Sequence, residues 1–248
     1  MKKYYIPFDI ETIPLPFEQL DESQQEYLIR GANTLEEIEK RKREMALSPL
    51  TGQIITIGLK VFQHNYDKNN NGTFELLSSG ALILNPELSE DKEIIQKEED
   101  GDIFVYASEA RILQMFWDVL KKYKKSTLIS FNGRNFDAPY VMLRSALLGV
   151  VPTRNIMAGT KYSYSDHIDL MDELTFHNPN SYTATRRYNF NFYAISFGIE
   201  SPKSQGIDGA NVYEYFLSQE YDTIAKYCLR DVEATWKLFL RIKDFLFL

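Results

Sequence analysis

The sequence predicts a mixed α/β fold in which a β-sheet is flanked by helices. Three observations support this class. Short apolar runs typical of strands occupy the N-terminal part, two further such runs are separated by helical patterns, and the C-terminal part is largely helical. With 248 residues, 44% of them hydrophobic, the chain can bury one sizeable core, so we expect a single domain over residues 1–248.

Three strands are expected near the start of the chain. Residues 4–10 combine aromatic and β-branched side chains in a buried run, and residues 53–62 form a second such run. Residues 73–78 are expected to pair with the second strand as a hairpin, because the Asn-rich segment 67–72 favours a turn.

The segment between the first two strands is expected to be an insertion. Prolines at positions 14, 16 and 49 interrupt it. Residues 34–45, TLEEIEKRKREM, alternate in charge, which is typical of a solvated helix with ion pairs one turn apart. We therefore interpret residues at about 14–50 as a helical insertion and not as a second domain.

A helix is expected after the three strands. Ser108 is a typical capping residue, and apolar side chains recur at helical spacing through residues 109–123. The stretch 89–102 before it is strongly acidic and is expected to be a surface loop.

The rest of the chain predicts two more strands, giving a five-stranded mixed sheet, and a helical end. The expected elements are a central parallel strand at 127–131, a helix at about 139–148, a strand at 165–170, and helices at 212–217 and 223–245.

Composition narrows the possible functions. No apolar run approaches the roughly 20 residues that cross a bilayer, so we expect a cytoplasmic protein without membrane contact. One cysteine and three histidines are too few, at these spacings, for a Cys/His zinc site, so any metal should be held by oxygen. The net charge of −7 argues against a protein that binds duplex nucleic acid by neutralising many phosphates. It argues less strongly against a protein that binds a single-stranded end through divalent cations.

Asp9 and Glu11, in the motif DIET, are the first candidate metal ligands. The two acids are two residues apart on an extended segment, so their side chains project to the same face and can share a cation. Taken alone, two acids near a strand end are more often solvated surface.

Asp137, in the motif NGRNFD, is the next candidate. Asn132 and its neighbours tolerate tight backbone angles, and Phe136 can anchor the loop in the core. The alternative is that Asp137 only caps the helix that follows, where a carboxylate offsets unpaired amide groups.

Tyr227 and Asp231 are four residues apart on the last expected helix. Their phenol and carboxylate therefore lie on one face, where they could flank one water molecule. The alternative is an ordinary amphipathic helix with Tyr227 half buried and Asp231 paired to Arg230 or a lysine. Open α/β sheets place their sites at the carboxyl edge, where all these acids could converge.

In these motifs the chain resembles the DEDD, or DnaQ-like, 3'-5' exonucleases, which have an RNase H-like fold. DIET, N-x-x-x-F-D and Y-x-x-x-D match the three motifs, and the tyrosine places the chain in the branch known as DEDDy. The stretches SFGIESPKSQGIDG at 196–209 and YCLRDVEAT at 227–235 are similar to predicted exonucleases related to the proofreading domain of family B DNA polymerases.

The resemblance implies a mechanism with two Mg²⁺ or Mn²⁺ ions. Asp9, Glu11 and Asp231 would hold the ion that activates water. Asp9 would bridge to a second ion supported by Asp137, and Tyr227 would orient the water. The implied substrate is the 3' end of single-stranded DNA, with RNA as a second option, and a polymerase or repair partner in trans is left open. Two alternatives are a non-catalytic nucleic-acid-binding or adaptor module on the same fold and a structure-selective endonuclease.

Further residues are candidates for substrate contact. Arg186 and Arg187 lie among aromatic residues at 182–197, a mixture that suits stacking on unpaired bases, although the aromatics could equally be core and the arginines solvated. The remaining candidates lie in or beside the motifs: Ile10, Thr12, Asn132, Phe136 and Lys203.

Overall fold

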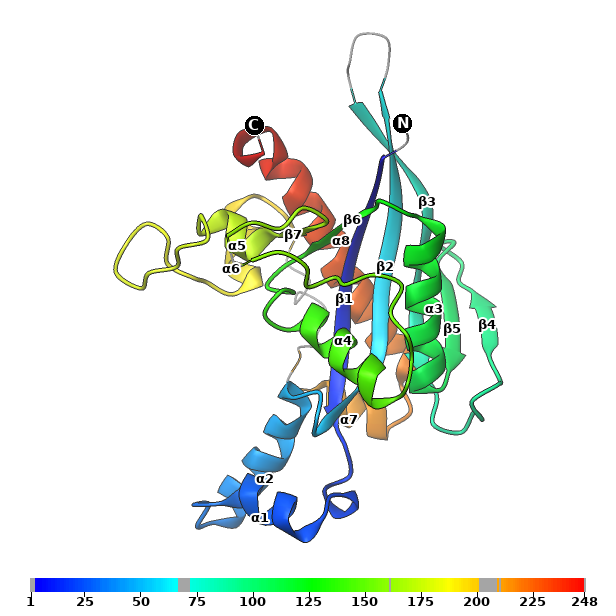
Figure 1. Ribbon diagram of the computed structural model, residues 1–248, viewed down its shortest axis with the longest axis vertical. Coiled ribbons are helices and arrows are strands. Elements are labelled where there is room, and N and C mark those ends of the chain that lie inside the picture. Colours follow the sequence, from blue (N-terminus) through cyan, green and yellow to red (C-terminus); the bar gives the residue numbers. More distant parts are fainter. Residues whose placement is uncertain (1–2, 67–71, 161, 201–208, 210, 248) are drawn as a thin grey trace.

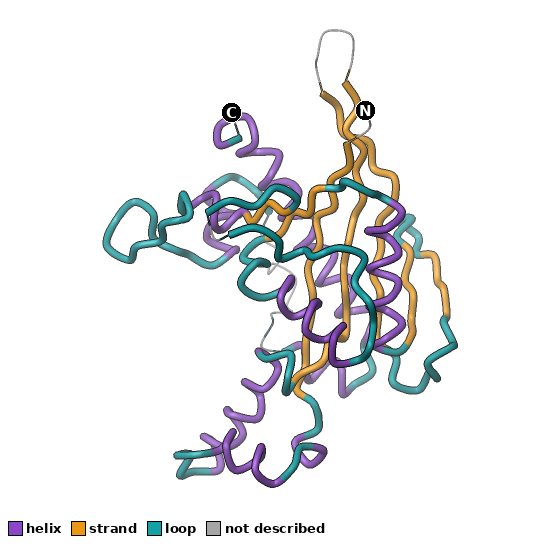
Figure 2. Tube along the Cα trace, viewed as in Figure 1, coloured by secondary structure: helices purple, strands orange, loops and turns teal. Residues whose placement is uncertain are grey.

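The computed structural model describes residues 3–66, 72–160, 162–200, 209 and 211–247. Its centre is a mixed sheet (Figures 1 and 2), for which the strand order β4-β5-β3-β2-β1-β6-β7 is observed among the described residues. The strands are β1 (Lys3–Pro14), β2 (Gly52–Tyr66), β3 (Gly72–Leu84), β4 (Ile94–Lys97), β5 (Ile103–Ala107), β6 (Thr127–Ser130) and β7 (His167–Asp169).

Helices cover both faces of the sheet. In Figure 1, α3 (Glu109–Lys122) and α4 (Asp137–Leu147) lie in front of the sheet, and the long α8 (Tyr221–Leu246) crosses behind it. The shorter helices are η1 (Phe17–Gln19), α1 (Glu22–Ile29), α2 (Leu35–Glu44), η2 (Met45–Leu47), α5 (Leu170–Leu174), α6 (Phe190–Ser196) and α7 (Val212–Leu217). Of the helices that are described, none combines the length and apolar content needed to cross a bilayer.

Alternation along β1 assigns its side chains to the two faces. Phe8 packs against Phe116 of α3, with 5.6 Å between ring centroids. Tyr5 packs against Phe239 of α8 at 5.5 Å, on the other face. Because successive side chains of a strand point to opposite faces, the side chains of Asp9 and Glu11 lie on the same face as Tyr5, the face covered by α8.

The α/β fold class is confirmed, but the sheet has seven strands and not five. The two additional strands are β4 and β5, and β4 lies inside the stretch expected to be an acidic surface loop. All four residues of β4 are exposed, so this edge strand has no buried face and no alternating pattern to reveal it.

β1 is also longer than expected. It continues to Pro14, which places Asp9 and Glu11 inside the strand and not at its end. Its parallel neighbour β6 is short and pairs only alongside residues Tyr5 to Pro7. Beyond Pro7, the β1 edge next to β6 is therefore open for other groups to approach.

A buried ion pair fixes α4 against α3 and β2. The Arg144 guanidinium donates from Nε to Glu109 Oε1 at 2.8 Å, and the same oxygen accepts from the Ile54 amide at 2.8 Å. Because the charges of this group are matched and its donors have acceptors, the C-terminal end of α4 is held in a defined position relative to the sheet.

Candidate active site

Asp9 of β1 lies opposite a glycine. Its register partner on β2 is Gly58, and a Cβ atom built on that glycine would lie 2.8 Å from the sulfur of Cys228 on α8. A side chain at position 58 would therefore push α8 away from the sheet. The absence of one lets α8 pack directly over the Asp9 carboxylate.

α8 brings Tyr227 and Asp231 to the same place. Tyr227 is only 6% exposed, and a hydrogen bond with the Asp231 side chain, together with the charges of Asp231, Glu11 and Asp9, contributes to its raised pKa. The largest cause of that shift is burial, which disfavours the phenolate. Tyr227 is thus buried beside three carboxylates, and it is more deeply buried than the alternative of a half-buried tyrosine supposed.

The loop after β6 positions Asp137 beside β1. The Asp137 carboxylate accepts a hydrogen bond from the Ile10 amide at 3.1 Å, on the β1 edge that β6 leaves open. The N-cap of α4 is Phe136, and no side-chain capping bond is present there. The Asp137 carboxylate also accepts from its own amide in the first turn of α4, so Asp137 contacts both the helix start and β1 beside Asp9 and Glu11.

Asp169, at the end of β7, shapes this loop. It is fully buried, and its carboxylate accepts from the amides of Asn132 and Arg134, each at 2.8 Å. Asn132 has a φ of 63°, a conformation that asparagine tolerates well. Gly133 follows, where a Cβ would overlap Ser130 Oγ and lie 3.1 Å from Asp137 Oδ2. The loop can be tight because the Asp169 carboxylate binds two of its amides and because Gly133, at its most crowded position, has no side chain.

Burial and, after it, mutual repulsion raise the pKa values of the acids in this site. Burial raises the pKa of Asp9 and of Glu11 well above the usual range, and the charges of Asp137 and Asp231 raise both further. Burial also raises the pKa of Asp137 to about 7. In the described part of the chain, no lysine, arginine or histidine forms an ion pair with Asp9, Glu11 or Asp137. Buried acids in such numbers either keep their protons, as these raised pKa values indicate, or are stabilised by a nearby positive charge, and the oxygen donors fit divalent cations.

This cluster predicts that the metal-free protein loses stability as the pH rises. The folded pKa values lie above the unfolded values of about 4, so the folded state binds more protons between about pH 4 and pH 7. The stabilisation is fully present below the unfolded pKa and is lost as the pH rises through the folded pKa. In chelator, we expect at least about 1 kcal/mol less stability at pH 7.5 than at pH 5, or about 2–4 °C in Tm.

Thermal unfolding followed by tryptophan fluorescence measures this effect. Mg²⁺ or Mn²⁺ should raise the Tm more at pH 7.5 than at pH 5, and Asp137→Asn, which keeps an acceptor for the Ile10 amide, should flatten the pH dependence. An identical pH dependence in wild type and Asp137→Asn would contradict the explanation.

The other candidate residues lie in different surroundings. Ile10 is 4% exposed and belongs to the main hydrophobic core. Thr12 Oγ1 donates to the Ala46 carbonyl of η2 at 2.9 Å and ties the 14–50 segment to β1. Phe136 packs on Tyr140, with 5.3 Å between ring centroids. Lys203 lies outside the described residues.

Arg186 and Arg187 lie on the exposed loop between α5 and α6, which projects from the sheet in Figure 1. The guanidinium of Arg186 lies over the Tyr188 ring at 5.3 Å, and Tyr188 stacks on Phe192 at 4.1 Å. Arg187 pairs with Asp172 at 3.7 Å. No contact of these arginines with the carboxylate cluster is present among the described residues.

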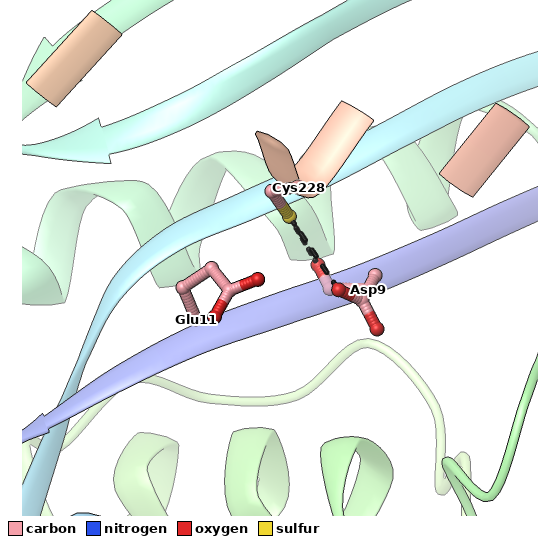
Figure 3. A group of neighbouring side chains, drawn as sticks. All are labelled: Asp9, Glu11 and Cys228. Atoms are coloured by element: carbon pink, nitrogen blue, oxygen red, sulfur yellow. Dashed lines mark hydrogen bonds between the residues drawn. The ribbon is translucent and has the colours of Figure 1, made fainter. Parts of the chain in front are cut away.

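Two residues of the site were missed from the sequence. Asp169 had a detectable signal, because an acid at a strand end directly before a helix can bind several amides, here including Met171 N at 3.0 Å. The other is Cys228, the single cysteine of the sequence. It is buried, but its sulfur lies 3.5 Å from the Asp9 carbonyl oxygen and 3.8 Å from Asp9 Oδ2 (Figure 3).

Comparisons with known proteins give a family for this chain. The family model described as "Predicted 3'-5' exonuclease related to the exonuclease domain of PolB" matches residues 92–246. That stretch contains Asp137, Tyr227 and Asp231, and it begins after Asp9 and Glu11.

Curated relatives are DNA polymerases. DNA polymerase 1 of Sulfolobus acidocaldarius is 26% identical over 148 residues, covering 57% of this chain and 16% of that protein. The DNA polymerase epsilon catalytic subunit of Emericella nidulans is 26% identical over 179 residues, covering 68% of this chain and 8% of that protein. The chain thus spans less than a fifth of the length of either relative.

A solved structure shows the same fold. The family B DNA polymerase of the archaeon Pyrobaculum calidifontis superposes with a TM-score of 0.51 at 20% identity, covering 97% of this chain and 24% of that one. The sheet and its flanking helices are therefore the RNase H-like fold that the sequence predicted. Because the family model covers more than half of the sequence, this chain belongs to the family of predicted 3'-5' exonucleases related to the exonuclease domain of PolB.

Proposed function

We propose that this protein is a divalent-metal-dependent 3'-5' exonuclease that hydrolyses phosphodiester bonds at the 3' ends of single-stranded DNA, with RNA as a second substrate. The observation that carries the proposal is the grouping of Asp9, Glu11, Asp137 and Asp231. Their charges raise one another's pKa values although they come from β1, α4 and α8. A buried set of this kind costs stability unless it serves to hold cations.

The oxygen ligands suit Mg²⁺ or Mn²⁺. Asp9, Glu11 and Asp231 would hold one ion, and Asp9 together with Asp137 would hold a second. When bound, the two cations would lower the pKa of an attacking water and stabilise the charge that develops on the leaving 3' oxygen. The Ile10 amide donates to Asp137 Oδ1 at 3.1 Å, which holds the Asp137 carboxylate beside β1.

Tyr227 is proposed to orient the attacking water. Burial and the three neighbouring carboxylates raise its pKa, so the phenol keeps its proton at neutral pH. A protonated phenol donates a hydrogen bond and does not remove a proton, so its role is to position the water and not to act as a base.

The decisive experiment is a product ladder. Purified protein is incubated with 5'-labelled single-stranded DNA, and with a matched RNA, in Mg²⁺ or Mn²⁺. We expect stepwise shortening from the 3' end that stops when chelator is added. Products of fixed internal length would instead indicate an endonuclease. Tight binding without any product would favour the non-catalytic module, although such a module has no physical need for a complete set of ligands.

The loop between α5 and α6 is proposed to bind the single strand at a distance from the active site. Tyr182 is 97% exposed, and the Arg186, Tyr188 and Phe192 side chains form a basic, stacked surface. Base stacking on an aromatic ring contributes about 1–3 kcal/mol per base. Arg186→Ala with Tyr188→Ala should therefore raise KM for long oligonucleotides by about 10-fold with little change in kcat.

The matched control is a second arginine–tyrosine pair. Arg30 lies over the Tyr27 ring at 5.4 Å on α1, and Tyr27 is 69% exposed. Arg30→Ala with Tyr27→Ala should leave KM unchanged. Equal effects of the two double variants, or an effect equally large on di- and trinucleotides, would show that the loop does not guide the strand.

A further inference from the structure

Cys228 lies inside the carboxylate site. Its sulfur, a carboxylate oxygen of Asp9 and a carboxylate oxygen of Glu11 all lie within 4.8 Å of one another, and Figure 3 shows the three side chains gathered between β1 and α8. Cys228 is fully buried. The sulfur thus forms part of the wall of the site and is not merely a residue of the nearby core.

The position of this sulfur is fixed by the fold. A Cβ at Gly58 would lie 2.8 Å from Sγ, so the space occupied by the sulfur exists only because β2 has a glycine there. On α8, Cys228 is next to Tyr227 and one turn from Asp231, so the helix cannot rotate the thiol away without moving those two side chains as well.

Glu11 provides independent evidence that a cation belongs here. It is 9% exposed, and its carboxylate is directed toward the same space. In the described part of the chain, Glu11 has neither a hydrogen-bond donor nor a basic partner. A buried carboxylate without a partner is stabilised by a metal ion.

One sulfur and two oxygen ligands change which cation the site prefers. Mg²⁺ takes oxygen ligands, whereas Zn²⁺ and related thiophilic ions bind thiolate strongly. Zn–S and Zn–O bonds of about 2.3 and 2.0–2.2 Å place tetrahedral ligands about 3.3–3.7 Å apart. Ligand atoms already within 4.8 Å of one another reach this spacing through small side-chain adjustments.

We propose that Asp9, Glu11 and Cys228 form a site for a thiophilic divalent cation, Zn²⁺ or Cd²⁺, which displaces the Mg²⁺ or Mn²⁺ that supports cleavage. The thiol releases its proton to solvent as the sulfur binds the cation, and water fills the fourth position. The binding site stands on the geometry alone. Only the consequence, inhibition by thiophilic metals, rests on the proposed exonuclease function.

Binding is tested without any activity measurement. The metal-free protein is titrated with Cd²⁺ while the ultraviolet charge-transfer absorption of cadmium–thiolate is followed. Because the chain has one cysteine, any such band reports Cys228. Wild type should give a band that saturates at one Cd²⁺ per chain and that excess Mg²⁺ weakens, since both ions need Asp9 and Glu11.

Two variants separate the ligand role from a packing role. Cys228→Ser and Cys228→Ala should lose the band and bind Cd²⁺ at least about 100-fold more weakly, because losing a ligand costs more than the 10–100-fold typical of outer-shell partners. Circular dichroism verifies that each variant is folded. Absence of the band in wild type, or unchanged Cd²⁺ affinity in a folded Cys228→Ser variant measured by calorimetry, would overturn the proposal.

An activity assay then tests the consequence. In Mn²⁺-supported cleavage, Zn²⁺ or Cd²⁺ should inhibit wild type at concentrations about 100-fold lower than those that inhibit Cys228→Ala, each relative to its own uninhibited rate. Equal sensitivity of the two proteins would overturn the inhibitory role. If neither protein cleaves, the exonuclease proposal fails, whereas the absorption titration still decides whether the metal site exists.

Discussion

Replacing Asp9 by Asn should lower the rate of 3'-end cleavage by about 10³-fold or more, an effect comparable to removing a principal stabilising group from an enzyme site. The pKa of Asp9 is raised by burial and also by the charges of Asp137, Asp231 and Glu11, so Asp9 interacts with all three of the other carboxylates. Asn keeps the size of the side chain and one oxygen, but it removes the negative charge that would bridge two cations.

The same substitution should stabilise the metal-free protein, since one of the repelling carboxylates is gone. Single-turnover cleavage of end-labelled DNA at saturating protein measures the chemical step, and urea denaturation measures stability. The matched control is Asp118→Asn, on an exposed turn of α3. Cleavage by Asp9→Asn within about 10-fold of wild type would remove Asp9 from the metal site.

Replacing Asp169 by Ala should lower the free energy of unfolding by about 3–5 kcal/mol, because three amides lose their acceptor at once. Asp169 is fully buried and accepts from Asn132, Arg134 and Met171 at 2.8, 2.8 and 3.0 Å. Two of these amides belong to the loop that ends at Asp137. The variant should therefore also weaken metal binding and cleavage, although Asp169 itself is not proposed as a ligand.

Hydrogen exchange locates the effect. The amides of Asn132, Arg134 and Met171 should exchange faster in Asp169→Ala, and urea denaturation gives the overall loss of stability. Asp166→Ala is the control, because this exposed acid precedes the same strand. If Asp169→Ala lost less than about 1 kcal/mol, or if Asp166→Ala lost as much, the three amides would not depend on this carboxylate.

The charge pattern identified a helix that buries no residue, whereas two strands of the sheet, β4 and β5, were not predicted. The charged run at 34–45 was correctly predicted as a helix, since α2 covers Leu35–Glu44 and begins with a capping box at Thr34. The edge strand β4 was missed because it is exposed on all four residues. Local sequence reports whether a segment has an apolar face, so an edge strand held mainly by backbone pairing gives almost no signal.

The motifs identified the acids that lie together, but for each motif an ordinary structural role explained the local sequence equally well. Asp137 could equally have been a helix cap. What decides its role is the Ile10 amide, 127 positions earlier in the chain, which becomes accessible because β6 ends its pairing opposite Pro7. No local pattern reports where a neighbouring strand stops.

From its sequence alone, this protein was determined to be an α/β domain with exonuclease-like motifs, because residue types and short spacings are properties of the chain itself. The tertiary structure decided what surrounds those motifs: Gly58 making room for the Cys228 sulfur, Asp169 clamping the loop before Asp137, and Ile10 holding the Asp137 carboxylate. These contacts join positions far apart in the chain, and the distance between two side chains depends on how strands and helices pack.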